Sequence, residues 1–177
     1  KVLAVLEAAG RDKISFRLLS APEKVIRALS PGHVWPGFLD DENIVVAGPL
    51  SGAEGEKAPE KLDDAKSPKV LKKINLSTGE EVEMHEFKGR LWDDVPLTIS
   101  PDRKRVTYYQ RAEGGGQSGL FVFDLEKGSE SLLSEGGTFF SWLPDSQHGY
   151  MFFKKEKKLK LVKSVPGKPL EVVSDLG

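Results

Sequence analysis

The sequence lacks cysteine altogether, so disulfide bonds, thiolate chemistry and cysteine-ligated metal sites are excluded. It also lacks a hydrophobic run as long as a membrane-spanning helix, and we find no segment with the order of a signal peptide. An excess of one charge is missing too, because 26 basic and 27 acidic side chains give a formal net charge of −1. General nucleic-acid binders carry a strongly basic face, so we expect neither a nucleic-acid partner nor insertion into a membrane.

Motifs of catalysis and metal binding are missing as well. The three histidines, His33, His85 and His148, lie far apart, and no His-x-x-x-His pair offers a local zinc scaffold. The run of residues 114–119 has the glycines of a phosphate-binding loop, but it lacks the following Lys-Ser/Thr and lies between two expected strands. No Gly-x-Ser-x-Gly elbow marks a hydrolase nucleophile. The sequence therefore predicts no catalytic residue, no metal and no cofactor.

What the sequence does contain is a repeated phrase. Two copies are residues 99–109, with Ser100-Pro101-Asp102, and residues 142–153, with Leu143-Pro144-Asp145. A looser copy lies at residues 38–47, around Asp40-Asp41. Each copy joins a short apolar strand to a β-rich strand through a turn, because proline pre-sets the turn dihedral and aspartate can accept bonds from the following amides.

The segments after each phrase repeat too. Each contains two further β-rich runs joined by a glycine turn, at residues 70–84, 119–134 and 159–173. Such strand–turn–strand series predict sheets of four antiparallel strands. Residues 1–29 fit the same frame without its first strand, although the alanine and leucine content of residues 2–9 leaves a short helix as an alternative.

The spacing of the turns indicates the size of the repeating unit. Asp145 follows Asp102 by 43 residues, which is a propeller-blade period. Asp102 follows Asp41 by 61 residues, and the excess falls in residues 51–68, which have almost no apolar side chains. We expect these residues to form a loop insertion within one blade rather than a linker between domains.

The Ser-Pro-Asp-x-Lys-Arg-Val phrase, followed by a Gly-Leu-Phe-Val-Phe-Asp-Leu strand and a Lys-Gly turn, resembles the TolB-like propeller repeat. This repeat is also called the WD-repeat-like PD40 family. Residues 90–137 carry the resemblance best, residues 138–177 well and residues 32–89 loosely. The family usually has glycine after the aspartate, where this chain has Arg103, Ser146 and Glu42. The resemblance implies a β-propeller, and often an extracytoplasmic or peptidase-associated setting, without naming a ligand.

We therefore expect an all-β fold of β-propeller blades, each of four antiparallel strands, in a single domain. The expected blades are residues 1–31 (partial), 32–89 with the loop insertion 51–68, 90–137 and 138–177. Because the first blade holds only three strands, we expect the chain to be part of a larger propeller. The alternative is association with another copy through the incomplete blade, since an open sheet edge invites pairing.

A candidate binding face follows from this topology. In such a blade, the loop between the second and third strands emerges on the same face as the connection to the next blade, which groups residues 51–68 and 111–118 with the connections. The connections contain eight residues that could contact a partner: His33, Trp35, Arg90, Trp92, Asp93, Asp94, Phe139 and Phe140. Aromatic side chains beside charges suit a protein interface, although packing between blades is the alternative for Trp35, Phe139 and Phe140.

The leading hypothesis is a non-enzymatic interaction module that presents this face to a protein or a small ligand. One alternative is the propeller portion of a prolyl-oligopeptidase-like hydrolase, with the catalytic domain outside residues 1–177. Another is an extracytoplasmic sensor or envelope domain, and the family resemblance favours an extracytoplasmic location. The basic run at residues 154–160 is expected at a hairpin tip, where charge keeps an edge soluble, with an anionic partner as the alternative.

Overall fold

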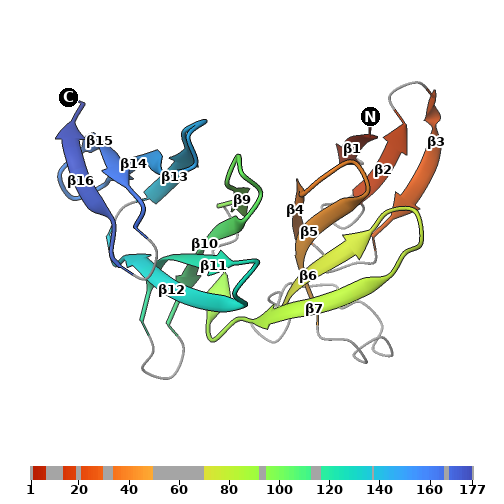
Figure 1. Ribbon diagram of the computed structural model, residues 1–177, viewed down its shortest axis with the longest axis horizontal. Coiled ribbons are helices and arrows are strands. Elements are labelled where there is room, and N and C mark those ends of the chain that lie inside the picture. Colours follow the sequence, from red (N-terminus) through yellow and green to blue (C-terminus); the bar gives the residue numbers. More distant parts are fainter. Residues whose placement is uncertain are drawn as a thin grey trace. The chain divides into compact units, whose positions relative to one another are not determined.

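The computed structural model describes residues 2–6, 14–18, 21–29, 34–49, 70–91, 95–112, 117–136, 138–165 and 168–176. All sixteen elements in these ranges are β-strands, and they form four antiparallel sheets (Figure 1). The predicted fold class is confirmed: the chain is all-β and built from antiparallel sheets consistent with propeller blades. It divides into two compact units, Lys1–Phe87 and Lys88–Gly177, which are described separately below.

The first unit contains two sheets. The strands of the first sheet are β1 (Val2–Leu6), β2 (Ile14–Leu18) and β3 (Ala21–Ala28), and those of the second are β4 (Val34–Phe38), β5 (Asn43–Gly48), β6 (Val70–Asn75) and β7 (Glu81–Glu86). All five residues of β1 pair with β2 in antiparallel register. The short helix considered for residues 2–9 is therefore wrong for the described residues 2–6, where pairing with β2 outweighs helix propensity.

The second unit also contains two sheets. The strands of its first sheet are β8 (Arg90–Leu91), β9 (Thr98–Ile99), β10 (Arg105–Arg111), β11 (Gly119–Asp124) and β12 (Ser129–Ser134). Those of its second sheet are β13 (Thr138–Trp142), β14 (His148–Phe153), β15 (Lys158–Lys163) and β16 (Glu171–Asp175). Arg90 was expected in a connection, but with Leu91 it forms the short strand β8, which pairs with the end of β10, while β9 pairs with its beginning.

Each unit has a core formed between its own two sheets. In the first unit, buried apolar side chains of both sheets meet: Phe16, Leu29, Ile44, Val46, Ile74 and Leu76. In the second unit, the core cluster likewise joins both sheets: Tyr109, Leu120, Val122, Leu133, Phe140, Met151 and Val162. A fully buried side chain of this size contributes about 1.5–3 kcal/mol, so each pair of sheets is held mainly by these contacts.

The repeated turns are built by aspartate side chains. Asp40 Oδ1 accepts hydrogen bonds from the backbone nitrogens of Glu42 and Asn43 at 2.8 and 2.7 Å, and Asp145 Oδ1 accepts the equivalent two bonds, both at 2.9 Å. The third turn uses Asp102, whose Oδ1 accepts from the backbone nitrogen of Lys104 at 3.2 Å. In the looser copy the residue that accepts the turn hydrogen bonds is therefore Asp40. The spacing of 61 residues given above starts from its neighbour, Asp41.

The residue after the aspartate explains why the related repeat favours glycine there. Arg103 and Ser146 follow Asp102 and Asp145 with φ angles of 61° and 58°, in the left-handed region that glycine enters at no steric cost. In this chain, arginine and serine side chains occupy a backbone conformation that they adopt less readily than glycine does.

The division of the chain into a single domain with four blades stays a prediction. The expected insertion at residues 51–68 lies outside the described residues. At the other end of the chain, all five residues of β16 are exposed, and Val172 and Val173 are about half exposed. Association through an incomplete blade remains a prediction too.

Candidate binding surface

The second unit has two ends, which are defined by its strands. We call the end at which β10, β12 and β14 finish the loop end, and the end at which β11, β13 and β15 finish the turn end. At the loop end, the Gln117 Nε2 atom donates to Glu135 Oε1 at 3.4 Å, so the loop after β10 meets the connection after β12. Within these segments, Ser118 Oγ accepts from the Ala112 nitrogen at 2.8 Å and Ser134 Oγ donates to the Gly136 carbonyl at 2.6 Å. This is the grouping of loops that the topology argument expected for this unit.

Phe139 stands out at the loop end. Its side chain is 65% exposed, the largest fraction among the exposed large hydrophobic residues in the described ranges. Its φ angle is 60°, and the register of β13 with β14 shifts between Thr138 and Phe140. An irregularity of this kind re-aims a side chain, and here it turns the ring outward in a backbone conformation that non-glycine residues rarely adopt.

Phe140, the next residue, points the other way. It is 6% exposed, belongs to the core cluster and meets the Trp142 ring edge-on at 4.9 Å between centroids. Its ring lies so close to Gly149 that a Cβ there would come within 2.6 Å of it. Phe140 therefore serves the packing between two sheets, which was the alternative for this residue.

The other candidate residues are less fully placed. Arg90 lies in β8, half-buried and opposite Arg111 in the strand register. Trp35 has its backbone in β4, but its side chain lies outside the described part of the structure, and so do His33, Trp92, Asp93 and Asp94 as whole residues. The prediction that these residues lie in connections is therefore wrong for four of the eight, because the backbones of Trp35, Arg90 and the pair Phe139–Phe140 lie in strands β4, β8 and β13. Within that pair, the exposed Phe139 and the buried Phe140 have different roles.

The basic run also lies at the loop end, in the hairpin between β14 and β15. Lys158 pairs with Asp175 at 2.7 Å, which raises the pKa of the lysine, and Lys160 pairs with Glu156 at 2.6 Å. The Lys160 ammonium also lies 4.7 Å from the centre of the Phe153 ring. Lys154 and Lys155, at the hairpin tip, are exposed. The run therefore combines intramolecular ion pairs with exposed positive charge beside the loops.

The turn end is organised differently, because its side chains connect two neighbouring sheets. The backbone nitrogen of Asp102 donates to Ser146 Oγ at 2.8 Å, which links the turns of two neighbouring sheets. The Arg105 guanidinium donates to Asp102 Oδ2 at 3.2 Å and to the Ser146 carbonyl, and lies 4.6 Å from the Trp142 ring centre. Burial opposes the ionisation of Asp102, but hydrogen bonds from Ser100 and Lys104 and the charge of Arg105 outweigh it and lower the pKa of the carboxyl.

The hydrogen bonds between these two turns were not predicted from the sequence. Their signal was present, because the third residue after each turn aspartate carries a side-chain donor: Asn43, Arg105 or His148. Only the spatial approach of two turns shows that Arg105 and Ser146 connect neighbouring sheets. The left-handed conformation of Phe139 could not be predicted from the sequence, because such a conformation is normally expected only at glycine.

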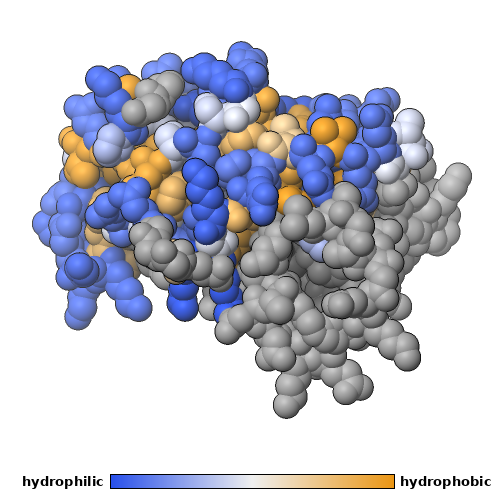
Figure 2. Space-filling model, turned by 90° about the horizontal axis from the view of Figure 1, so that it is seen from below, coloured by the Kyte–Doolittle hydropathy of each residue, from blue (hydrophilic) through white to orange (hydrophobic). Residues whose placement is uncertain are grey.

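The described ranges contain neither a candidate metal site nor a candidate membrane-spanning helix. No three His, Asp or Glu side chains gather there as a group that could hold a metal ion. Nor do the described residues include a helix long and apolar enough to cross a membrane. Figure 2 shows hydrophobic surface between hydrophilic side chains on one face of the molecule.

No family model matches the chain, and no curated protein matches it. Among solved structures, it is similar to TolB from Acinetobacter baumannii, with a TM-score of 0.62, 18% identity, and coverage of 99% of this chain and 41% of that chain. It is also similar to a putative TolB from Agrobacterium tumefaciens, with a TM-score of 0.61, 13% identity, and coverage of 99% and 61%. Oligogalacturonate lyase from Vibrio parahaemolyticus gives a TM-score of 0.59, 16% identity, and coverage of 94% and 48%.

Likeness at this level of identity establishes a fold. The chain spans between 41 and 61% of the length of these three structures. TolB and oligogalacturonate lyase are β-propeller proteins, and four antiparallel sheets in chain order are what propeller blades require. The chain therefore has the fold of β-propeller blades.

Proposed function

We propose that the chain is a non-enzymatic binding module of the TolB-like propeller repeat type, which presents its loop end to a partner. The observation that carries this proposal is Phe139, an aromatic ring that is 65% exposed at a φ angle of 60°. A residue held in a rarely populated conformation with its ring in solvent contributes little to folding. Such features cluster where a protein contacts something else.

The surroundings of Phe139 favour a protein over a small ligand. Exposed polar side chains lie at the same end of the unit, namely Gln117, Glu135, Lys154 and Lys155. Aromatic anchors ringed by polar groups are the usual energetic centres of protein interfaces. A small ligand would instead need an enclosing pocket, and one pocket of the second unit, described below, lies at the turn end.

Site-specific crosslinking tests the assignment of the face. Phe139 is replaced by a photoreactive phenylalanine analogue in the natural full-length protein, and Lys104, which is 54% exposed at the turn end, is replaced in the same way as the control. We expect the analogue at position 139 to capture a defined partner that the analogue at position 104 does not capture.

Affinity measurements with the captured partner then test the contribution of the side chain. Phe139→Gly should weaken binding by about tenfold or more, because an aromatic anchor contributes about 2 kcal/mol or more. The triple alanine variant of Arg90, Trp92 and Asp94 should weaken binding of the same partner without unfolding the chain. Capture at position 104 in place of position 139, or unchanged affinity of both variants, would refute the proposed face.

A further inference from the structure

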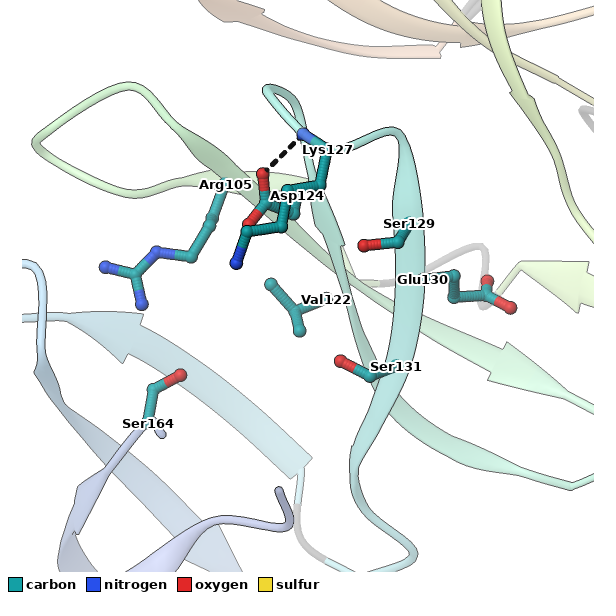
Figure 3. Close-up of a pocket in the computed structure, with 8 residues that line it drawn as sticks. All are labelled: Arg105, Val122, Asp124, Lys127, Ser129, Glu130, Ser131 and Ser164. Atoms are coloured by element: carbon teal, nitrogen blue, oxygen red, sulfur yellow. Dashed lines mark hydrogen bonds and ion pairs between the residues drawn. The ribbon is translucent and has the colours of Figure 1, made fainter. Parts of the chain in front are cut away.

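A pocket of about 240 Å³ lies at the turn end of the second unit, away from the loop end. It opens between the sheet containing β10–β12 and the residue that follows β15 (Figure 3). The residues that line it are almost all polar: Arg105, Val122, Asp124, Lys127, Ser129, Glu130, Ser131 and Ser164. Neither the candidate surface nor the proposed function uses this pocket.

Ser164 is a largely buried polar residue in the lining of the pocket. The residue is 6% exposed, and its backbone nitrogen donates to the Gln147 carbonyl at 2.7 Å, which fixes its position. Figure 3 shows its hydroxyl directed into the space between Arg105 and Val122. No hydrogen bond joins this hydroxyl to a residue in the described ranges, and its oxygen is accessible from the pocket. It is therefore available to donate to a polar group in the pocket.

Arg105 forms one wall and is held in place before any ligand arrives. Asp102 and the Ser146 carbonyl each accept from its Nη2 atom, and the Trp142 ring lies beneath it. A guanidinium has five N–H donors, and no described residue accepts from Nε or Nη1. The side chain is therefore a fixed cation with donors to spare at the edge of the pocket.

A second cation reaches the pocket from the opposite side. Figure 3 shows the Lys127 side chain running down into the pocket, and its Nζ atom lies 3.6 Å from Asp124 Oδ2. The other oxygen of Asp124 is occupied by the backbone nitrogens of Glu126 and Lys127, at 3.0 and 2.9 Å. At this distance the ion pair between the ammonium and the carboxylate is long, and the ammonium keeps N–H donors for a ligand.

The remaining polar groups add hydroxyls but little negative charge. In Figure 3 the hydroxyls of Ser129 and Ser131 point from β12 toward the pocket, whereas the Glu130 side chain points away from them. Glu130 accepts from the Tyr108 hydroxyl at 2.5 Å and lies 4.0 Å from Lys88. Its carboxylate is therefore engaged on the other side of the strand.

We infer that this pocket binds a small ligand through an oxyanion, the chemistry shared by phosphate, sulfate and carboxylate groups. Two cations and three serine hydroxyls converge on it. Of the two carboxylates in its lining, Asp124 is already bonded to two amides and Glu130 points away. Charge-assisted bonds from guanidinium and ammonium groups are the usual means of holding such groups. The volume admits an oxyanion with a small organic body attached.

The test is a titration of the 177-residue chain with inorganic phosphate, sulfate or acetate, followed by amide NMR at constant ionic strength set by chloride. We expect saturable shifts of the Ser131 and Ser164 amides, with a dissociation constant on the order of 1 mM. Lys127→Gln should weaken binding about tenfold. Lys104→Gln is the matched control, because Lys104 also pairs with an acidic residue, Glu126 at 2.8 Å, but does not line the pocket.

A second variant tests the buried hydroxyl without a change of charge. Ser164→Ala removes only that oxygen and should weaken the bound anion several-fold while the amide spectrum elsewhere stays as in the unaltered chain. The relative affinities for phosphate, sulfate and acetate identify which oxyanion the pocket takes. The inference is overturned if no shift saturates, if Lys104→Gln weakens binding as much as Lys127→Gln, or if only a neutral sugar such as glucose binds.

Discussion

The two ends of the second unit differ in how their polar side chains are used. At the turn end, Asp102, Arg105 and Ser146 bind one another across two neighbouring sheets. At the loop end, Gln117 pairs with Glu135 and Lys158 with Asp175 without joining the two sheets, and Phe139 extends a ring into solvent. The side-chain contacts at the turn end therefore join neighbouring sheets, whereas the loop end is the surface that we propose for recognition.

The same contrast appears among the three aspartate turns. Asn43 and His148 donate to the aspartate of their own turn, whereas Arg105 bonds its own turn and reaches the next one. A longer side chain at the same position thus turns a local cap into a contact between sheets. Similar turns therefore contribute unequally to the free energy of unfolding, which variants at each turn can measure.

The largest effect is expected from Arg105 at the turn end of β10, compared with Arg111 at the loop end of the same strand. Arg105→Ala removes a cation that is 14% exposed from Asp102, the Ser146 carbonyl and the Trp142 ring, and should lower the free energy of unfolding by about 3 kcal/mol. Arg111→Ala, at the exposed loop end of the same strand, should cost less than about 1 kcal/mol. Urea unfolding followed by circular dichroism measures both, and equal losses would remove the contrast between the ends.

A smaller loss is expected from Ser146→Ala. The hydroxyl accepts from the Asp102 nitrogen at 2.8 Å in a residue that is 5% exposed, so its removal should cost about 1 kcal/mol. Ser141→Ala, on an exposed position of β13, serves as the control. The same unfolding titration compares them, and a loss no larger than that of the control would show that the turns are not coupled through this bond.

A gain in stability is expected when glycine replaces an exposed residue that has a positive φ angle. Arg103 and Lys157 are exposed at φ angles of 61° and 53°, one at the turn end and one at the loop end. Replacing either with glycine should raise the free energy of unfolding by about 0.5–1 kcal/mol, because relief of strain exceeds the added entropy of the unfolded chain. Thermal unfolding tests this, and a loss of stability in both variants would mean that these side chains hold their turns.

The smallest effect concerns the pH dependence of the Asp145 turn. The backbone bond from His148, its ring bond at 2.6 Å and the backbone bond from Gln147 lower the pKa of Asp145 from 3.8 to about 2. A carboxyl with a depressed pKa in the folded state stabilises above 3.8, and this stabilisation is lost as the pH falls toward 2. His148→Ala keeps both backbone donors, so the pKa should rise but stay below 3.8. A carboxyl-carbon NMR titration measures it, with Asp124 as the internal control, and an unchanged value would exclude the ring bond.

Much of this fold could be predicted from the sequence because its determinants are local. Proline, aspartate and alternating apolar residues mark turns and strands within a few positions, so β10, β11 and β12 follow directly from residues 99–134. The short strand β8, in a segment expected to be a connection, could not be predicted, since it depends on how that segment meets β10. The register shift at Phe139 and its φ angle of 60° also have no signal in the composition.

The candidate sites divide along the same line. Aromatic residues in a connection pointed to the loop end, although the pattern could not tell which ring is exposed. The pocket at the turn end escaped prediction because Arg105, Lys127 and Ser164 come from three separate segments. Each of these residues looks like an ordinary surface position when taken alone.

The most direct test of the proposed contrast is the free energy of unfolding of Phe139→Gly, measured by urea titration beside the unaltered chain. If the loop end holds an aromatic ring at the expense of stability, the variant should be more stable by about 0.5–1 kcal/mol, since glycine accepts a φ angle of 60° without strain. A loss of about 1 kcal/mol or more would show that Phe139 belongs to the packed structure, and would contradict the assignment of the loop end to recognition.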